Sequence, residues 1–175
     1  MALFENALSV AKPLDPSFTV GKKLRTVQAV ITVGSSSANG DIYILAKGLP
    51  ATARIAGIVL PKGSAAVTGL SDVDVGFYAS HTSESLDGSG NLVVNNTVID
   101  KDALVDGATF ASAKAYSIDL LGDGVSSFDP TKSIGELCSL SSQDFPAHGV
   151  DVCATLNAVG TATGTIYVNV LVAED

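Results

Sequence analysis

The sequence predicts an all-β domain, a sandwich or barrel of short strands with an extended N-terminal arm and one or two short helices. Three observations lead to this prediction. Apolar residues recur with a period of two in most segments, as they do in half-buried strands. Turns rich in Gly, Pro and Asn separate these segments at short intervals, while helical periodicity is scarce. The length of 175 residues suits a single domain.

The first 24 residues differ from the rest of the chain and predict an N-terminal arm, which leaves residues 25–175 for the β-sandwich domain. Pro13 and Pro16 interrupt this segment, and Lys22-Lys23 closes it. Two interpretations of the arm remain open. It docks on a neighbouring subunit, or it folds back on its own domain as a first edge strand.

The predicted strands are distributed along the whole of the remaining chain. In 26–33 and 165–173 every second residue is apolar, and in 73–80 Val73, Val75 and Phe77 share one face. Asn39-Gly40 is a hairpin-type turn, and the Gly-rich residues 87–91 form another. The faces predicted to be buried in the first and last of these strands are Val27, Ala29, Ile31 and Val33, and Ile166, Val168, Val170 and Val172. The other predicted strands are 42–47, 53–60, 92–99, 114–121 and 149–159.

Two segments predict short helices. Residues 100–107 could form one or two turns capped by Asp100. Residues 131–140 carry Ser133 as an N-cap with Glu136 three positions later, which is the spacing of a capping box.

The composition points to an interface. Only 16% of residues are charged, and hydrophobic residues make up 46%, so charges cannot cover the whole surface. Part of the surface is then apolar or lightly polar, as at a contact with copies of itself or with a partner. The alternative is a surface of Gly, Ser, Thr and Asn with no interface.

Charge and hydropathy also exclude several partners. A net charge of −8 with scattered basic residues argues against nucleic acid. No run of 18 apolar residues is present, so no membrane span is expected. Glu5 stands where a signal peptide needs positive charge, so we expect synthesis in a cytoplasm without export of the individual chain.

No residue pattern predicts catalysis, a metal or a cofactor. His81 and His148 match no zinc spacing, and Cys138 and Cys153 lie in apolar runs typical of reduced core cysteines, although one disulfide between them stays open. The sequence has neither a G-x-S-x-G elbow nor a phosphate-binding glycine motif. We therefore expect no enzyme and no catalytic, cofactor-binding or metal-binding residue.

Two acidic groups and the tyrosines need separate interpretation. Asp87, Ser89 and Asn91 begin like a calcium loop, but Leu92 and Val98 stand where Gly and Glu are required, so a β-turn is preferred. Asp72 and Asp74 share a strand face and could meet a cation, but a solvated strand edge is the preferred interpretation. The four tyrosines all fall within predicted strands and are assigned to core or sheet-face packing: Tyr43, Tyr78, Tyr116 and Tyr167.

Residues 40–60 (GDIYILAKGLPATARIAGIVL), with 72–78 (DVDVGFY) after them, resemble a pattern in tailed-phage structural proteins. In that pattern a strand ends at a corner of the form lP-x-x-A-r-I, and D-x-D-v-G-l-Y comes next. The chain resembles the capsid cement, or decoration, proteins, and this resemblance implies a jelly-roll-like β-sandwich.

The resemblance implies a structural virion protein that binds the outside of a phage capsid and stabilises capsomer contacts. The partners would be the major capsid protein and the chain itself, as a homodimer or homotrimer, and the location would be the virion. An alternative is a phage fibre domain or another receptor- or glycan-binding sandwich. A third hypothesis is a hydrolase, which would need a cleft that joins His81 to Asp72 or Asp74.

Overall fold

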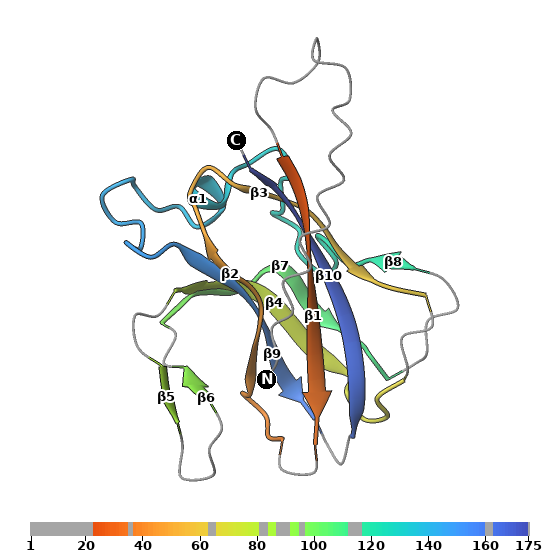
Figure 1. The fold of residues 1–175 in the computed structure, drawn as a ribbon. Helices are drawn as coiled ribbons and strands as arrows, with labels where there is room; N and C mark the ends of the chain where they lie inside the picture. The colour runs from red at the N-terminus through yellow and green to blue at the C-terminus, as the bar shows by residue number, and fades with distance from the viewer. Residues whose placement is uncertain are drawn as a thin grey trace.

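The protein is an all-β sandwich, as predicted. The computed structural model describes residues 23–34, 37–62, 66–80, 84–86, 92–94, 97–111, 117–159 and 163–174. Two four-stranded antiparallel sheets pack against each other, and a third sheet has two strands (Figure 1). Within the described ranges, no helix approaches the length and apolar character needed to cross a membrane.

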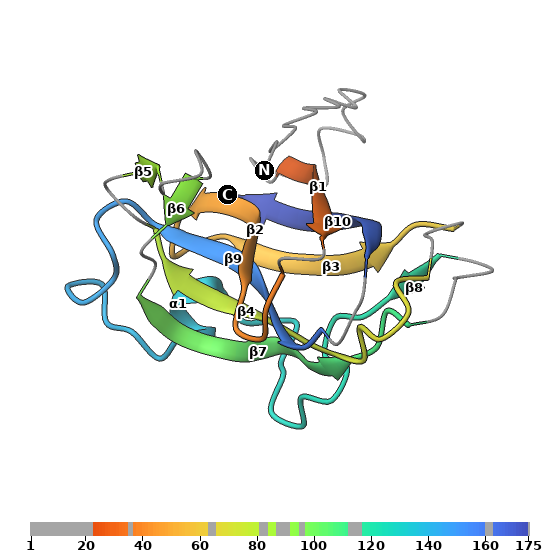
Figure 2. The same ribbon diagram turned by 90° about the horizontal axis from the view of Figure 1, so that it is seen from below.

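The strand order in the first sheet is β1 (Lys23–Val33), β10 (Gly164–Glu174), β3 (Arg54–Leu60) and β8 (Ile118–Asp119). The order in the second sheet is β2 (Ile42–Leu49), β9 (Val150–Ala158), β4 (Asp72–Ala79) and β7 (Val98–Ala108). The hairpin strands are β5 (Glu84–Leu86) and β6 (Leu92–Val94). Figure 2 shows the two large sheets edge-on, with β1 and β7 on opposite sides of the molecule.

The core lies between the two sheets and is built by the alternation seen in the sequence. The predicted inward face of β1 is buried, and so is that of β10. In β4 the residues Val73, Val75 and Phe77 point into the same core. These side chains are almost entirely aliphatic, so their burial supplies the main stabilising free energy of the fold.

The short helix α1 (Ile134–Leu137) confirms the predicted capping box. The Glu136 carboxylate accepts hydrogen bonds from the backbone N–H and the hydroxyl of Ser133, each at 2.8 Å. Ile134 is fully buried and ties this helix to the core.

The prediction of a helix at 100–107 was wrong, because these residues form the middle of β7. Ala103, Leu104 and Val105 are three consecutive apolar residues, which suits a helix as well as a strand. The pairing of β7 with β4 contains register shifts, and these bulges allow Leu104 and Val105 both to be buried.

Three other predicted elements differ from the structure in their boundaries or in what they connect. The apolar run 92–99 is divided between β6 and the start of β7. Of 114–121, only Ile118–Asp119 forms a strand among the described residues, and Tyr116 lies outside them. The Asn39-Gly40 turn is present, with Gly40 at φ 92°. It connects β1 to β2, which lie in different sheets, so the turn does not form the predicted hairpin.

The first described strand begins at Lys23, so Lys23 and Leu24, which were assigned to the arm, belong to the sandwich. Residues 1–22 lie outside the described part of the chain.

Gly76 marks a close approach of two strands. A Cβ atom at Gly76 would overlap the carbonyl oxygen of Asp100 and the carbonyl carbon of Lys101. Both overlaps are with backbone, so a side chain here would force β7 away from β4.

We expect Gly76→Ala to lower the free energy of unfolding by at least about 2 kcal/mol, because it overpacks a rigid backbone contact. Urea unfolding of the purified chain measures this. Gly57→Ala on β3 is the control, since the nearest atom to its Cβ would be a side-chain oxygen of Asp119 at 3.2 Å and no backbone atom is among its near neighbours. An equal loss in both variants would contradict the close approach at Gly76.

Candidate functional site

The outer face of the first sheet carries no charged side chain along its two longest strands. The outward positions of β1 and β10 alternate with buried ones, and all are uncharged. We call this surface the β1–β10 face: Leu24, Thr26, Gln28, Val30, Thr32, Thr165, Tyr167, Asn169, Leu171 and Ala173. Leu24 is 63% exposed and Tyr167 is 47% exposed. Tyr167 lies directly opposite Val30 in the strand register.

Acidic residues gather on the other side of the molecule. β7 carries Asp100, Asp102 and Asp106, and the segment after β8 adds Asp123 and Asp129. Figure 2 shows β7 and this segment on the side opposite β1. The outward positions of β1 and β10 are therefore uncharged, whereas the side of the molecule that carries β7 is acidic.

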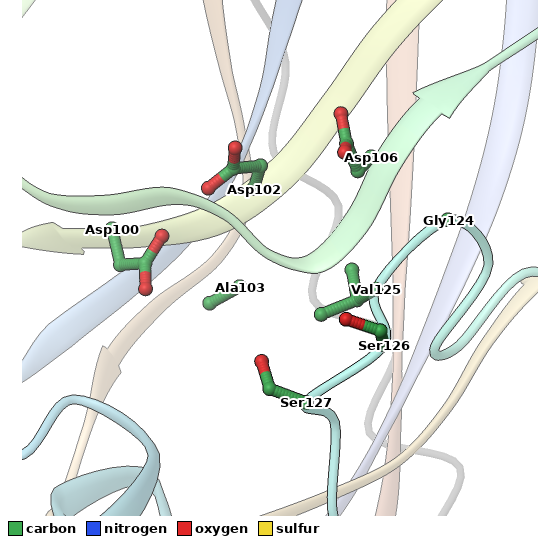
Figure 3. A pocket seen from close by; sticks show the side chains of 8 residues that line it. All are labelled: Asp100, Asp102, Ala103, Asp106, Gly124, Val125, Ser126 and Ser127. Carbon is green, nitrogen blue, oxygen red and sulfur yellow. The ribbon is translucent and has the colours of Figure 1, made fainter.

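A shallow hollow of about 210 Å³ lies between β7 and the loop at 124–127. Figure 3 shows three aspartates of β7 on one side of it and Ser126 and Ser127 on the other. Burial raises the pKa of Asp100, and its hydrogen bond with Asp102 raises it further. Among the described residues, no group of three or more His, Cys, Asp or Glu side chains is arranged to hold a metal ion.

Asp74 is the centre of a polar cluster between β4, β7 and β9. Its carboxylate accepts hydrogen bonds from the Lys101 ammonium at 2.8 Å, the Asn157 amide at 2.6 Å and the Gly107 N–H at 3.1 Å. The Asn157 amide also donates to Asp72 at 3.1 Å. Only 2% of Asp74 is exposed, so these donors replace the water that the carboxylate loses.

These contacts determine the protonation states of Asp74 and Lys101. Burial alone raises the pKa of Asp74, but the hydrogen bonds from Lys101, Asn157 and Gly107 outweigh it and leave the pKa below its ordinary value. The hydrogen bond to Asp74 raises the pKa of Lys101. Both groups are therefore charged at neutral pH and form a fixed ion pair.

This arrangement corrects the interpretation of Asp72 and Asp74 as a solvated strand edge. Asp72 is partly exposed, whereas Asp74 is buried and bound to protein donors. Lys101, Asn157 and Gly107, which complete the cluster, had no recognisable pattern in the sequence. They lie 27, 83 and 33 residues from Asp74, and only the sheet brings them together.

The tyrosines have different environments. Tyr43 packs against the core, and its hydroxyl donates to the Thr32 carbonyl at 3.1 Å. Tyr78 is buried against Ile44 and Cys153 and shares a short hydrogen bond with Thr155. Packing is thus confirmed for Tyr43 and Tyr78. Tyr167 lies on a sheet face, as predicted, but about half of its surface is open to solvent.

The remaining candidates form no site in the described residues. Cys138 and Cys153 are reduced thiols, as preferred from the sequence, and Cys153 is fully buried. Burial raises the pKa of Cys138 to about 12, with a smaller contribution from the charge of Asp100. His148 is exposed in the loop before β9, while His81, Asp87, Ser89 and Asn91 lie outside the described residues.

We expect Asp74→Asn to lower the free energy of unfolding at pH 7 by about 2 kcal/mol, because it removes charge-assisted hydrogen bonds to a buried group. The pKa of Asp74 is below 3.8 in the folded protein. Its stabilising effect is therefore present above that value and is lost as the pH falls through the folded pKa. Urea unfolding between pH 7 and pH 3 should show the difference from wild type shrinking in acid.

Asp72→Asn is the matched control for that measurement, since Asp72 is partly exposed and a single contact with Asn157 is seen for it. A difference for Asp74→Asn that stays constant down to pH 3 would contradict the ionic cluster.

We expect both thiols to resist iodoacetamide at pH 8 in the folded protein. A Cys138 pKa of about 12, against an ordinary 9.0, lowers the thiolate fraction roughly a thousandfold. Mass spectrometry of labelled chain, with and without urea, measures the two rates. Rapid labelling of Cys138 in the native protein would contradict its burial.

Comparison with protein-family models, curated proteins and solved structures found no match to this chain. The chain's own surface and geometry are therefore the basis for a functional proposal. Among the described residues, the feature with the clearest functional consequence is the uncharged β1–β10 face.

Proposed function

We propose that this protein is a structural virion protein, a capsid cement or decoration protein that binds the outside of a phage shell and stabilises contacts between capsomers. The observation that carries this proposal is the β1–β10 face. Ten outward positions on two adjacent long strands carry no charge, in a chain with a net charge of −8.

The physical argument concerns the cost of removing water. Removing a charged side chain from water at an interface costs far more free energy than removing Thr, Asn or Gln, whose polar groups can hydrogen-bond to the partner, and aliphatic side chains gain free energy on burial. Leu24 and Tyr167 add apolar area that contact with a partner would bury. The acidic side would then face the solvent and keep decorated particles apart.

Binding to a shell also gains from repetition. A shell presents the same site many times, so a decoration protein with modest contacts to several subunits binds tightly by multivalency. A closed oligomer, such as a dimer or trimer, would match the local symmetry axes of the shell.

The strand connectivity supports the jelly-roll part of this proposal. The chain crosses between the two large sheets after β1, β2 and β3 and again after β7, β8 and β9. The last strand, β10, returns to pair with β1 along its whole length. A double-sheet sandwich whose strands return in this way is the arrangement that jelly rolls use.

A second candidate is a fibre or glycan-binding module. The observation that favours it is the exposed ring of Tyr167, since sugar rings stack on open aromatic side chains. A receptor-binding sandwich would use the same face for a carbohydrate instead of a protein shell.

We expect the chain to co-sediment with shells assembled from the major shell protein encoded beside its own gene. Tyr167→Glu should weaken this binding at least about tenfold, because it places a charge in the interface. Gln143→Glu, an exposed change in the loop before β9, carries the same added charge and should leave binding unchanged.

A glycan array tests the second candidate with the same two variants. Failure of the wild-type chain to sediment with shells would refute the decoration function. Carbohydrate binding lost in Tyr167→Glu, together with that failure, would establish the glycan-binding alternative.

A further inference from the structure

β1 has a long, regular open edge. It pairs with β10 over all eleven residues without a register shift, and among the described strands none pairs with its other side. The carbonyl of Thr32 accepts a hydrogen bond from the Tyr43 hydroxyl, so it points to this open side. Because backbone groups alternate along a strand, those of Thr26, Gln28 and Val30 also point to the open side.

The other three edges of the two large sheets are protected. β8 has only two residues, and the carboxylate of one of them, Asp119, accepts the Ile58 N–H of β3 at 2.9 Å. β2 has two register shifts in its pairing with β9, and at one of them the Gly48 N–H donates to the side-chain carboxylate of Asp151 in β9 at 2.8 Å.

The fourth edge, β7, has register shifts and three aspartates. Bulges, charges and short strands are the features that prevent a sheet edge from pairing with another chain. Between Thr26 and Val33, β1 has none of them. It is therefore the edge suited to strand addition.

We propose that β1 pairs antiparallel with β1 of a second copy of this chain, across a two-fold axis that passes through Gln28. Gln28 then lies opposite Gln28 of the second copy, and Thr26 lies opposite Val30. The side-chain amides of the two glutamines can hydrogen-bond across the axis, and the backbone groups of all three positions gain partners.

Because residues 26–33 of β1 are uncharged, this edge is where a second copy can pair with the least repulsion. Two chains that each carry a net charge of −8 repel one another over most of their surfaces. At the central part of β1 neither copy places a charge opposite the other, and both place their acidic strand β7 on the far side (Figure 2). The close approach is therefore least costly at β1.

The pairing has a consequence for the proposed function, on which this part of the inference rests. A two-fold axis perpendicular to the sheet joins the two first sheets into one continuous sheet. The two β1–β10 faces then lie on the same side, which doubles the uncharged surface presented to a shell and adds avidity.

The test uses the isolated full chain and size-exclusion chromatography with light scattering. Wild type should have twice the mass of the 17.7 kDa chain. Gln28→Lys should raise the dimer dissociation constant at least about tenfold, because it places like charges directly opposite each other. Gln28→Glu should do the same, and an equimolar mixture of the two variants should restore the dimer.

Gln143→Lys is the control for net charge, and urea unfolding confirms that the Gln28 variants remain folded. A wild-type monomer at micromolar concentration, as would result if residues 1–22 covered the edge of their own domain, would overturn the inference. So would a Gln28→Lys dimer of unchanged stability, or a mixture that stays monomeric. Shell sedimentation is measured separately, so a monomer that still binds shells would refute the pairing alone.

Discussion

The two sheets are held together by the side chains that alternate inward along β1, β10, β4 and β9. In β10 the residues Ile166, Val168, Val170 and Val172 are buried, and their neighbours point out. Branched aliphatic residues at every second position stiffen the strands and fill the space between the sheets. Every other feature depends on this constraint, because it decides which residues are left to form the outer faces.

The outer faces of the two sheets differ in regularity and in the polar contacts that hold their strands. On the second sheet, β7 departs from regular pairing, and its backbone crosses close to Gly76. The Asp74 carboxylate holds this irregular strand by binding both Lys101 and the Gly107 N–H. A buried ion pair adds little net stability compared with apolar packing, but it fixes a single arrangement, and losing one partner is costly.

On the first sheet, the outward side chains of β1 and β10 include no buried carboxylate of this kind. β1 and β10 pair regularly with each other, and their outward residues are uncharged polar or aliphatic side chains with one tyrosine. Regular pairing, an open β1 edge and the absence of charge between Thr26 and Thr32 together make this side suited to contact with other proteins. The acidic residues of β7 keep the opposite side well hydrated. The proposed shell binding and the proposed pairing of β1 both use the uncharged part of this surface.

The sequence by itself determined the fold class, the buried faces of β1, β4 and β10, and the capping box of α1, because each depends on residues close together in the chain. It also predicted a surface short of charge. It could not distinguish strand from helix at 100–107, since Ala103-Leu104-Val105 suits both until β4 provides a partner. Only the tertiary structure decided that Lys101 and Asn157 meet at Asp74, that Tyr43 closes one end of the β1 edge, and that the uncharged positions share one face. These are contacts between residues distant in the chain, and pairing between strands creates them.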